Sequence, residues 1–117
     1  MDINVSTHGM QIDTGTESFV REQIQSALQR FEDQVVSVDA FLKDINGPKG
    51  GIDKQVLIRI RLRNRQVIAT EITRANFRAA VVVVTRKARR AVRRSLKKSQ
   101  QRHRWRISAG LTEATES

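Results

Sequence analysis

Residues 54–63 alternate between apolar and polar side chains more strictly than any other segment of the chain. The even positions from Val56 to Leu62 are all apolar, and positions 59, 61 and 63 are all arginine. A period of two residues is that of a β-strand with one buried and one solvated face. A single strand cannot bury that face by itself. The chain is therefore expected to build a sheet that is covered on one side and open on the other.

Three more segments carry strand-like patterns. Residues 2–8 and 36–42 alternate in the same way. Residues 67–73 are rich enough in β-branched side chains to form a further strand, although their pattern does not indicate which face points toward the core. Residues 46–51 contain three glycines and the only proline of the chain, which is typical of a loop. The sequence therefore predicts four strands, with this loop between the second and the third.

A first helix is expected from residue 14 to about residue 33, between the first and second strands. Asp13 can cap its start, and Thr14 with Glu17 fits a capping box. Apolar residues then recur every three or four positions from Val20 to Phe31. That spacing is the period of a helix with one buried face.

A second, longer helix is expected to begin near Ala75 and to end near Ser99. Its apolar stripe runs from Phe77 to Leu96 at helical spacing. Residues 81–84 are all valine and by themselves favour a strand, but they lie inside this continuous stripe, so we assign them to the helix. Residues 101–117 are predicted to form a polar, flexible tail after a single domain of residues 1–100. The order is β-α-β-β-β-α, an α+β fold in which two helices pack on one face of a four-stranded sheet.

The charge of the chain is unevenly distributed. Its 22 Lys and Arg outnumber 12 Asp and Glu, which gives a formal net charge of +10. Residues 1–51 carry −4 and residues 52–117 carry +14, and between Ile72 and Thr112 there are 13 bases and no acid. Such uncompensated charge is typical of a chain with a polyanionic partner, either nucleic acid or an anionic lipid surface. Because 16 of the bases are arginine, whose planar fork fits phosphate and stacks on bases, nucleic acid is favoured.

The residues that catalysis or metal binding would need are scarce. There is no cysteine, which excludes disulfides, cysteine-bound zinc and thiol nucleophiles. The two histidines, His8 and His103, have no carboxylate at a spacing that suggests acid–base or metal chemistry. The longest apolar run has six residues, where a membrane span needs about 20, and the start of the chain lacks the features of a signal peptide. We therefore expect a soluble cytoplasmic protein that is not an enzyme, with no cofactor, metal, membrane or small-molecule substrate.

The candidate RNA-binding residues lie on the second helix, on the face opposite its apolar stripe. They are Arg86, Lys87, Arg89, Arg90, Arg93, Arg94, Lys97 and Lys98. A merely solvated helix face and a membrane-surface helix are the alternatives, but the stripe is made mostly of small Val and Ala side chains that suit packing on a sheet. Possible further contacts are Arg78, Arg59, Arg61, Arg63, Lys49 and Arg102. Because the open sheet face is expected to show arginines and no aromatic side chains, recognition of phosphates and shape is favoured over stacking of bases.

Several short motifs occur in a fixed order over residues 2–98. They are Ile3, Asn4 and Val5; Gly9, Met10, Gln11 and Ile12; Phe19 and Val20; Leu28 and Phe31; the strand at 36–42; Ala69, eight residues before Phe77, Arg78, Ala79 and Ala80; and the closing basic helix. In the order and spacing of these motifs the chain resembles the ribosome hibernation-promoting factor family of bacteria, in its short, YfiA-like form.

That resemblance implies a β-α-β-β-β-α domain that binds the small ribosomal subunit in its tRNA and mRNA channel. A member of that family would contact the rRNA there and inhibit translation, as a stress response when growth stops. The resemblance also implies that the RNA-binding bases lie largely on the last helix, and we expect a monomer off the ribosome. The alternative that stays open is a general structured-RNA-binding protein or RNA chaperone without a fit to that channel.

Overall fold

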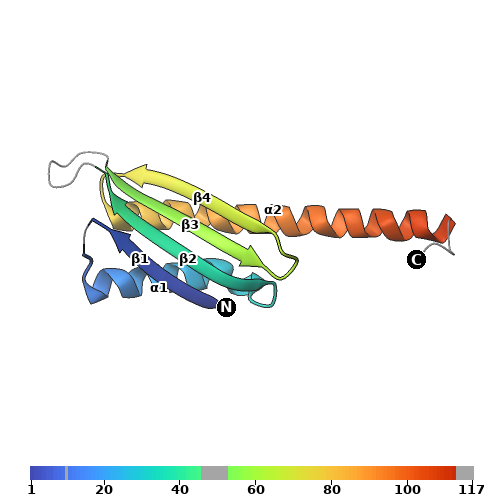
Figure 1. The fold of residues 1–117 in the computed structure, drawn as a ribbon, viewed down its shortest axis with the longest axis horizontal. Coiled ribbons are helices and arrows are strands. Elements are labelled where there is room, and N and C mark those ends of the chain that lie inside the picture. The colour runs from blue at the N-terminus through green and yellow to red at the C-terminus, as the bar shows by residue number, and fades with distance from the viewer. Residues whose placement is uncertain (10, 46–52, 113–117) are drawn as a thin grey trace.

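The computed structural model describes residues 1–9, 11–45 and 53–112, with side chains as far as residue 101. The elements follow one another as β1 (Asp2–His8), α1 (Thr14–Leu28), the short 3-10 helix η1 (Gln29–Phe31), β2 (Val35–Asp44), β3 (Lys54–Leu62), β4 (Val67–Arg74) and α2 (Phe77–Thr112). The order β-α-β-β-β-α and the α+β class predicted from the sequence are confirmed (Figure 1).

The four strands form one sheet in the order β1-β2-β3-β4, which is also their order in the chain. β1 pairs with β2 in parallel, whereas β2 with β3 and β3 with β4 are antiparallel. A parallel pair needs a crossover connection, and α1 supplies it. Both helices lie on the same side of the sheet, α1 beneath β1 and β2 and α2 beneath β3 and β4, so the other face is open (Figure 1).

The sequence pattern does not determine which face of β4 points toward the core, and the pairing of β4 with β3 sets it. Ile68, Thr70 and Ile72 alternate as half-buried residues with exposed neighbours at 67, 69 and 71. Ile68 and Ile72 pack against the core, so the β-branched residues at even positions point toward α2. This register also decides which β4 residues can lie beside the basic helix.

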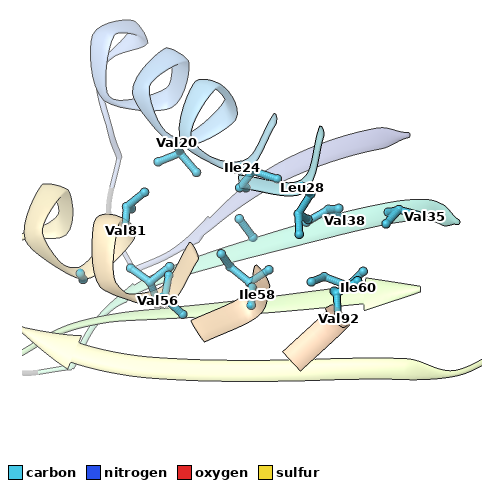
Figure 2. Close-up of a cluster of buried hydrophobic side chains, with 14 of the residues drawn as sticks. Val20, Ile24, Leu28, Val35, Val38, Val56, Ile58, Ile60, Val81 and Val92 are labelled. Atoms are coloured by element: carbon cyan, nitrogen blue, oxygen red, sulfur yellow. The ribbon is translucent and has the colours of Figure 1, made fainter. Parts of the chain in front are cut away.

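The core fills the layer between the sheet and the two helices (Figure 2). Its fully buried apolar residues are Val20, Ile24 and Leu28 from α1; Val35, Val38, Ala40 and Leu42 from β2; Val56, Ile58, Ile60 and Leu62 from β3; and Ala80, Val81, Val84, Ala88 and Val92 from α2. Burying one Val, Leu or Ile side chain stabilises the folded state by about 1.5–3 kcal/mol. The alternation in β3 and the stripe in α2 therefore meet in one apolar layer, as the sequence predicts.

Both helices begin at an acceptor side chain that caps the first turn. Asp13 Oδ1 accepts from the backbone N–H of Thr16 at 2.8 Å, so Asp13 is the cap of α1 and Thr14 is already helical. Hydrogen bonds from Thr16 hold the pKa of Asp13 below its usual value, with a smaller contribution from the charge of Arg78. Asn76 Oδ1 accepts from Ala79 N–H at 2.8 Å in the same way at the start of α2. Capping of this kind typically contributes about 1 kcal/mol.

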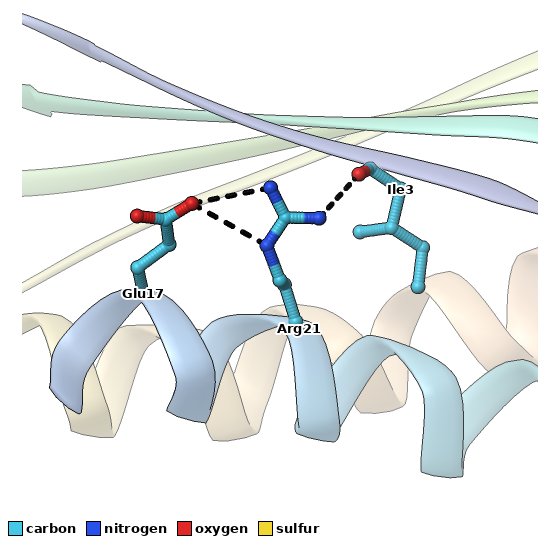
Figure 3. Close-up of polar contacts among 3 residues, drawn as sticks. All are labelled: Ile3, Glu17 and Arg21. Carbon is cyan, nitrogen blue, oxygen red and sulfur yellow. Dashed lines mark hydrogen bonds and ion pairs between the residues drawn. The ribbon is translucent and has the colours of Figure 1, made fainter. Parts of the chain in front are cut away.

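Arg21 ties α1 to the edge strand β1 (Figure 3). Its Nη1 donates to the carbonyl oxygen of Ile3 at 2.6 Å, and its Nη2 lies 3.1 Å from Glu17 Oε1, one helical turn away. An edge strand leaves backbone acceptors unpaired on its outer side, where they can recruit another strand. Arg21 satisfies one of these carbonyls and so holds the helix against the edge.

The C-terminal ends of α1 and α2 differ from those predicted from the sequence. α1 ends at Leu28 and continues as η1 to Phe31, where the sequence predicts helix to about residue 33. α2 continues to Thr112, past the predicted end at Ser99, and it runs well beyond the sheet (Figure 1). The molecule is consequently elongated, with principal extents of 64 × 22 × 19 Å. Residues 101–112, predicted as part of a tail, are thus helical, and residues 113–117 lie outside the described residues.

Candidate nucleic-acid interface

α2 carries the core stripe and the predicted binding residues on different sides. Among the α2 residues whose side chains are described, up to residue 101, Val92 is the last buried one and Leu96 is the last partly buried apolar residue that packs on the core. All eight predicted bases are exposed: Arg86, Lys87, Arg89, Arg90, Arg93, Arg94, Lys97 and Lys98. The helix therefore presents a basic surface while its opposite side holds the fold together.

These bases are not compensated by acidic neighbours. Within the described part of the chain, none of the eight forms an ion pair, since the ion pairs there involve Arg21, Lys54 and Arg59. Like charges one helical turn apart repel each other and destabilise an isolated helix. Uncompensated positive charge on a rigid helix creates a potential that attracts polyanions, and each phosphate contact adds salt-dependent affinity.

The basic residues of α2 fall into rows on different flanks of the helix. One row has the spacing i, i+3, i+7 and borders a groove of about 240 Å³ that is lined by Thr70, Lys87, Arg90, Ala91 and Arg94. We name Lys87, Arg90 and Arg94 the groove row. Arg86, Arg89 and Arg93 have the same spacing one residue earlier, which turns them about 100° around the helix axis. We name these three the outer row.

Arg59, Arg61 and Arg63, on β3 and just after it, have different contacts and do not form a uniform basic row. Arg59 Nη2 lies 3.5 Å from Asp39 Oδ2, and its guanidinium carbon lies 5.4 Å from the ring centre of Phe41. Arg63 follows the end of the strand, and its Nε donates to the carbonyl oxygen of Asp33 at 2.5 Å. Arg61 is exposed on the open face. Two of the three side chains thus have partners inside the protein.

The open sheet face also carries an aromatic residue that the sequence analysis missed. Phe41 faces Leu57 across β2 and β3, and the two form the apolar part of a hollow of about 320 Å³. The hollow is also lined by Ser6, Thr7, His8, Leu42, Lys43, Gln55 and Glu71. The expectation of an open face without aromatic side chains is therefore wrong. The signal was present, because Phe41 occupies an odd position between Asp39 and Lys43 in the alternation of β2.

Of the remaining predicted residues, the structure describes the side chain of Arg78. The guanidinium carbon of Arg78 sits 4.7 Å from the ring centre of Phe19, so it links the start of α2 to α1. Lys49 lies outside the described residues, and Arg102 belongs to α2 with a side chain that is not described. His8 is exposed at the end of β1.

Two features that would point to other functions are absent from the described residues. In the described ranges, no three His, Asp or Glu side chains gather closely enough to hold a metal ion. Over the same residues no helix combines the length and the apolar character that crossing a membrane would require.

Comparisons with known proteins give one family match and several structures with a similar fold. The family model described as sigma 54 modulation protein / S30EA ribosomal protein matches residues 3–100. A ribosomal subunit interface protein from Coxiella burnetii has a similar fold, with a TM-score of 0.72 and 14% identity over 83% of this chain and 99% of that one. The N-terminal domain of Protein Y from Thermus thermophilus matches with a TM-score of 0.66 and 18% identity over 80% of this chain and 98% of that one. A search of curated protein sequences gives no significant match.

Proposed function

The chain belongs to the sigma 54 modulation protein / S30EA ribosomal protein family, a family of ribosome-associated factors, and from that membership we propose a specific mode of action. The protein binds the rRNA of the small ribosomal subunit in the channel for tRNA and mRNA, and by filling that channel it inhibits translation. The basic surface of α2 makes the main contacts with the RNA.

The observation that carries this proposal is the set of eight exposed bases on α2 without acidic partners among the described residues. A phosphate backbone supplies regularly spaced negative charges along such a helix, and arginine can bind each phosphate through two N–H groups. The helix is anchored on the core through Val84, Ala88 and Val92, so contacts made by its bases fix the position of the whole body. A bound body of this size then obstructs the channel.

Salt dependence of binding tests the contribution of these bases. If about six to eight of them meet phosphates, the logarithm of the binding constant falls by about 0.7–0.9 per contact for each tenfold increase in salt. We expect the affinity measured by cosedimentation with purified small subunits to fall by about 300-fold to 20,000-fold between 50 and 200 mM NaCl. Absent binding, or binding that ignores salt, would contradict the proposal.

A competition experiment separates a channel-specific fit from general affinity for RNA. Small subunits should displace a labelled protein from the ribosome far better than an equal mass of free duplex RNA. If duplex RNA competed equally well, a general structured-RNA-binding protein or RNA chaperone would be the better description.

The proposed mode of action involves binding alone. It acts by occupying a site, in the cytoplasm and as a monomer off the ribosome, and no catalytic step is required. His8→Ala should leave inhibition of in vitro translation unchanged, because His8 lies on the open sheet face away from α2. A large loss of inhibition in this variant would contradict a role confined to binding through α2.

A further inference from the structure

A groove lies between β4 and α2 on the basic surface. It has a volume of about 240 Å³ and is bounded by Thr70 from the strand and by Ala91 and the groove row from the helix. A water molecule in the liquid occupies about 30 Å³, so this space accommodates a phosphate group together with several waters. The small side chain of Ala91 keeps the space between the bases open.

The helical spacing explains why three bases border one groove. Residues at i, i+3 and i+7 lie on the same flank of a helix over about two turns, which is about 10 Å of helix length. That flank faces β4, because Lys87 Nζ donates to the carbonyl oxygen of Glu71 at 3.2 Å. The hydrogen bond uses one of the three Lys87 donors, holds the ammonium group at the groove and leaves two donors available.

The charge inside the groove is positive without compensation. Its lining contains three cationic side chains and no carboxylate. Glu71 is next to Thr70 in β4, but its side chain lines the hollow on the opposite face of the sheet. Three converging cations favour an anion between them, and the guanidinium forks of Arg90 and Arg94 suit a tetrahedral oxyanion that can accept paired N–H groups.

We propose that the β4–α2 groove is a discrete binding site for one phosphate group, held by Lys87, Arg90 and Arg94. The site rests on the proposed function in that the RNA backbone is one source of the phosphate. It goes further in two respects. It separates these three bases from the other five of the eight predicted bases. It also extends to free phosphorylated molecules, which would compete with RNA for the groove.

A matched pair of triple variants tests the site on the free protein. K87Q/R90Q/R94Q removes the groove row, and R86Q/R89Q/R93Q removes the outer row. Each variant loses three positive charges from exposed positions at the same spacing. Pyrophosphate, titrated by calorimetry at fixed ionic strength, should bind the wild-type protein at one saturable site. The groove-row variant should bind at least tenfold more weakly, and the outer-row variant should stay within about twofold of the wild-type protein.

Both variants should show the helical circular dichroism of the wild-type protein, and their melting temperatures should agree with each other, before their affinities are compared. If the two variants weakened pyrophosphate binding equally, the basic surface would act only as a diffuse field and the site would be refuted. Absence of saturable binding to the wild-type protein would refute it as well.

The same variants, tested on small subunits, distinguish this site from the proposed function. We expect the groove-row variant to lose about tenfold more affinity for small subunits than the outer-row variant. If both variants lost pyrophosphate affinity equally, the site would be refuted. The proposed function would remain intact as long as the wild-type protein still cosedimented with small subunits in a salt-dependent way. Selective pyrophosphate binding without cosedimentation would support the site, refute the proposed function and identify free phosphorylated molecules as the source of the phosphate.

Discussion

Lys54 connects two carboxylates at the start of β3. Its Nζ lies 2.8 Å from Asp44 Oδ2 and 3.3 Å from Asp53 Oδ1, and the side chain of Asp53 is fully buried. A buried carboxylate is costly unless a positive charge lies close to it. The hydrogen bond to Asp44 raises the pKa of Lys54 above its ordinary value, and partial burial works in the opposite direction. Lys54 therefore joins the end of β2 to the start of β3.

Lys54→Met should lower the melting temperature at pH 7, because the variant leaves Asp53 buried beside Asp44 without the ammonium group. The pKa of Lys54 is higher in the folded than in the unfolded state, so its stabilisation is complete below pH 10.5. It is lost as the pH rises through the folded pKa. Melting curves recorded from pH 7 to pH 11.5 should show the deficit of the variant shrinking at the alkaline end.

The exposed Lys43 on the neighbouring strand provides the control for that measurement. Lys43→Met removes the same charge without touching a buried carboxylate and should change the melting temperature little. Equal effects of the two substitutions would show that the contacts of Lys54 contribute nothing specific.

At the scale of secondary-structure elements, the six regular elements follow from the sequence, and the helix ends do not. Phe31 is spaced like a further helical residue after Leu28, but it belongs to η1, because over a single turn the 3-10 and α periods place apolar residues similarly. The stripe of α2 fades near Ser99 because the helix leaves the sheet. Gln, Arg and Lys are good helix formers, and they continue the helix past the end of the stripe. The amphipathic stripe thus predicts the packed length of a helix and not its full length.

In the candidate site, too, one part could be predicted from the sequence and another part could not. Exposure of the eight bases on α2 could be predicted, because a helix that buries a Val and Ala stripe must turn its remaining residues outward. The groove could not be predicted, because it depends on the register that places Thr70 beside Ala91. Neither the inward face of β4 nor its position along α2 is encoded in local periodicity.

Removing residues 102–117 should leave the domain folded, since the core contains α2 residues from Ala80 to Val92, all before the cut. Helices in proteins gain most of their stability from tertiary packing, so we expect the free energy of unfolding to change by less than about 1 kcal/mol. Urea denaturation measures this change. Val92→Ala, which trims a buried side chain, should cost about 2 kcal/mol in the same assay. A large loss on truncation would show that the predicted domain of residues 1–100 is incomplete.

For the whole molecule, binding and folding make opposite demands on α2. Among the eight predicted bases of α2, five pairs lie four positions apart: Arg86 with Arg90, Arg89 with Arg93, Arg90 with Arg94, Arg93 with Lys97, and Arg94 with Lys98. Each such pair destabilises a helix by about 0.2–0.5 kcal/mol at low salt. The folded state therefore carries a repulsion of about 1–2 kcal/mol that a polyanion would relieve.

Salt should consequently stabilise the free protein while it weakens binding to RNA. Raising NaCl from 10 to 300 mM shortens the screening length from about 30 Å to about 6 Å. We expect the melting temperature to rise by about 5 °C, since 1 kcal/mol corresponds to about 4–8 °C in a small domain.

R90Q/R93Q removes four of the five like-charged pairs, and its melting temperature should respond less to salt than that of the wild-type protein. If salt lowered the melting temperature of the wild-type protein, the ion pairs elsewhere would outweigh the repulsion on α2, and this account of its stability would be wrong.

The sheet keeps its strands in chain order from β1 to β4, and this simple topology has an electrical consequence. The half of the chain with a net charge of −4 lies toward the β1 edge, and the half with +14 lies toward the β4 edge and α2. A strand order that interleaved the two halves of the chain would bring these opposite charges together and cancel them. Here the molecule has a large electric dipole moment across its strands, and the field of a polyanion exerts a torque that turns α2 toward it before contact. Productive encounters are then selected during diffusion, so the topology of the sheet contributes to the rate of association.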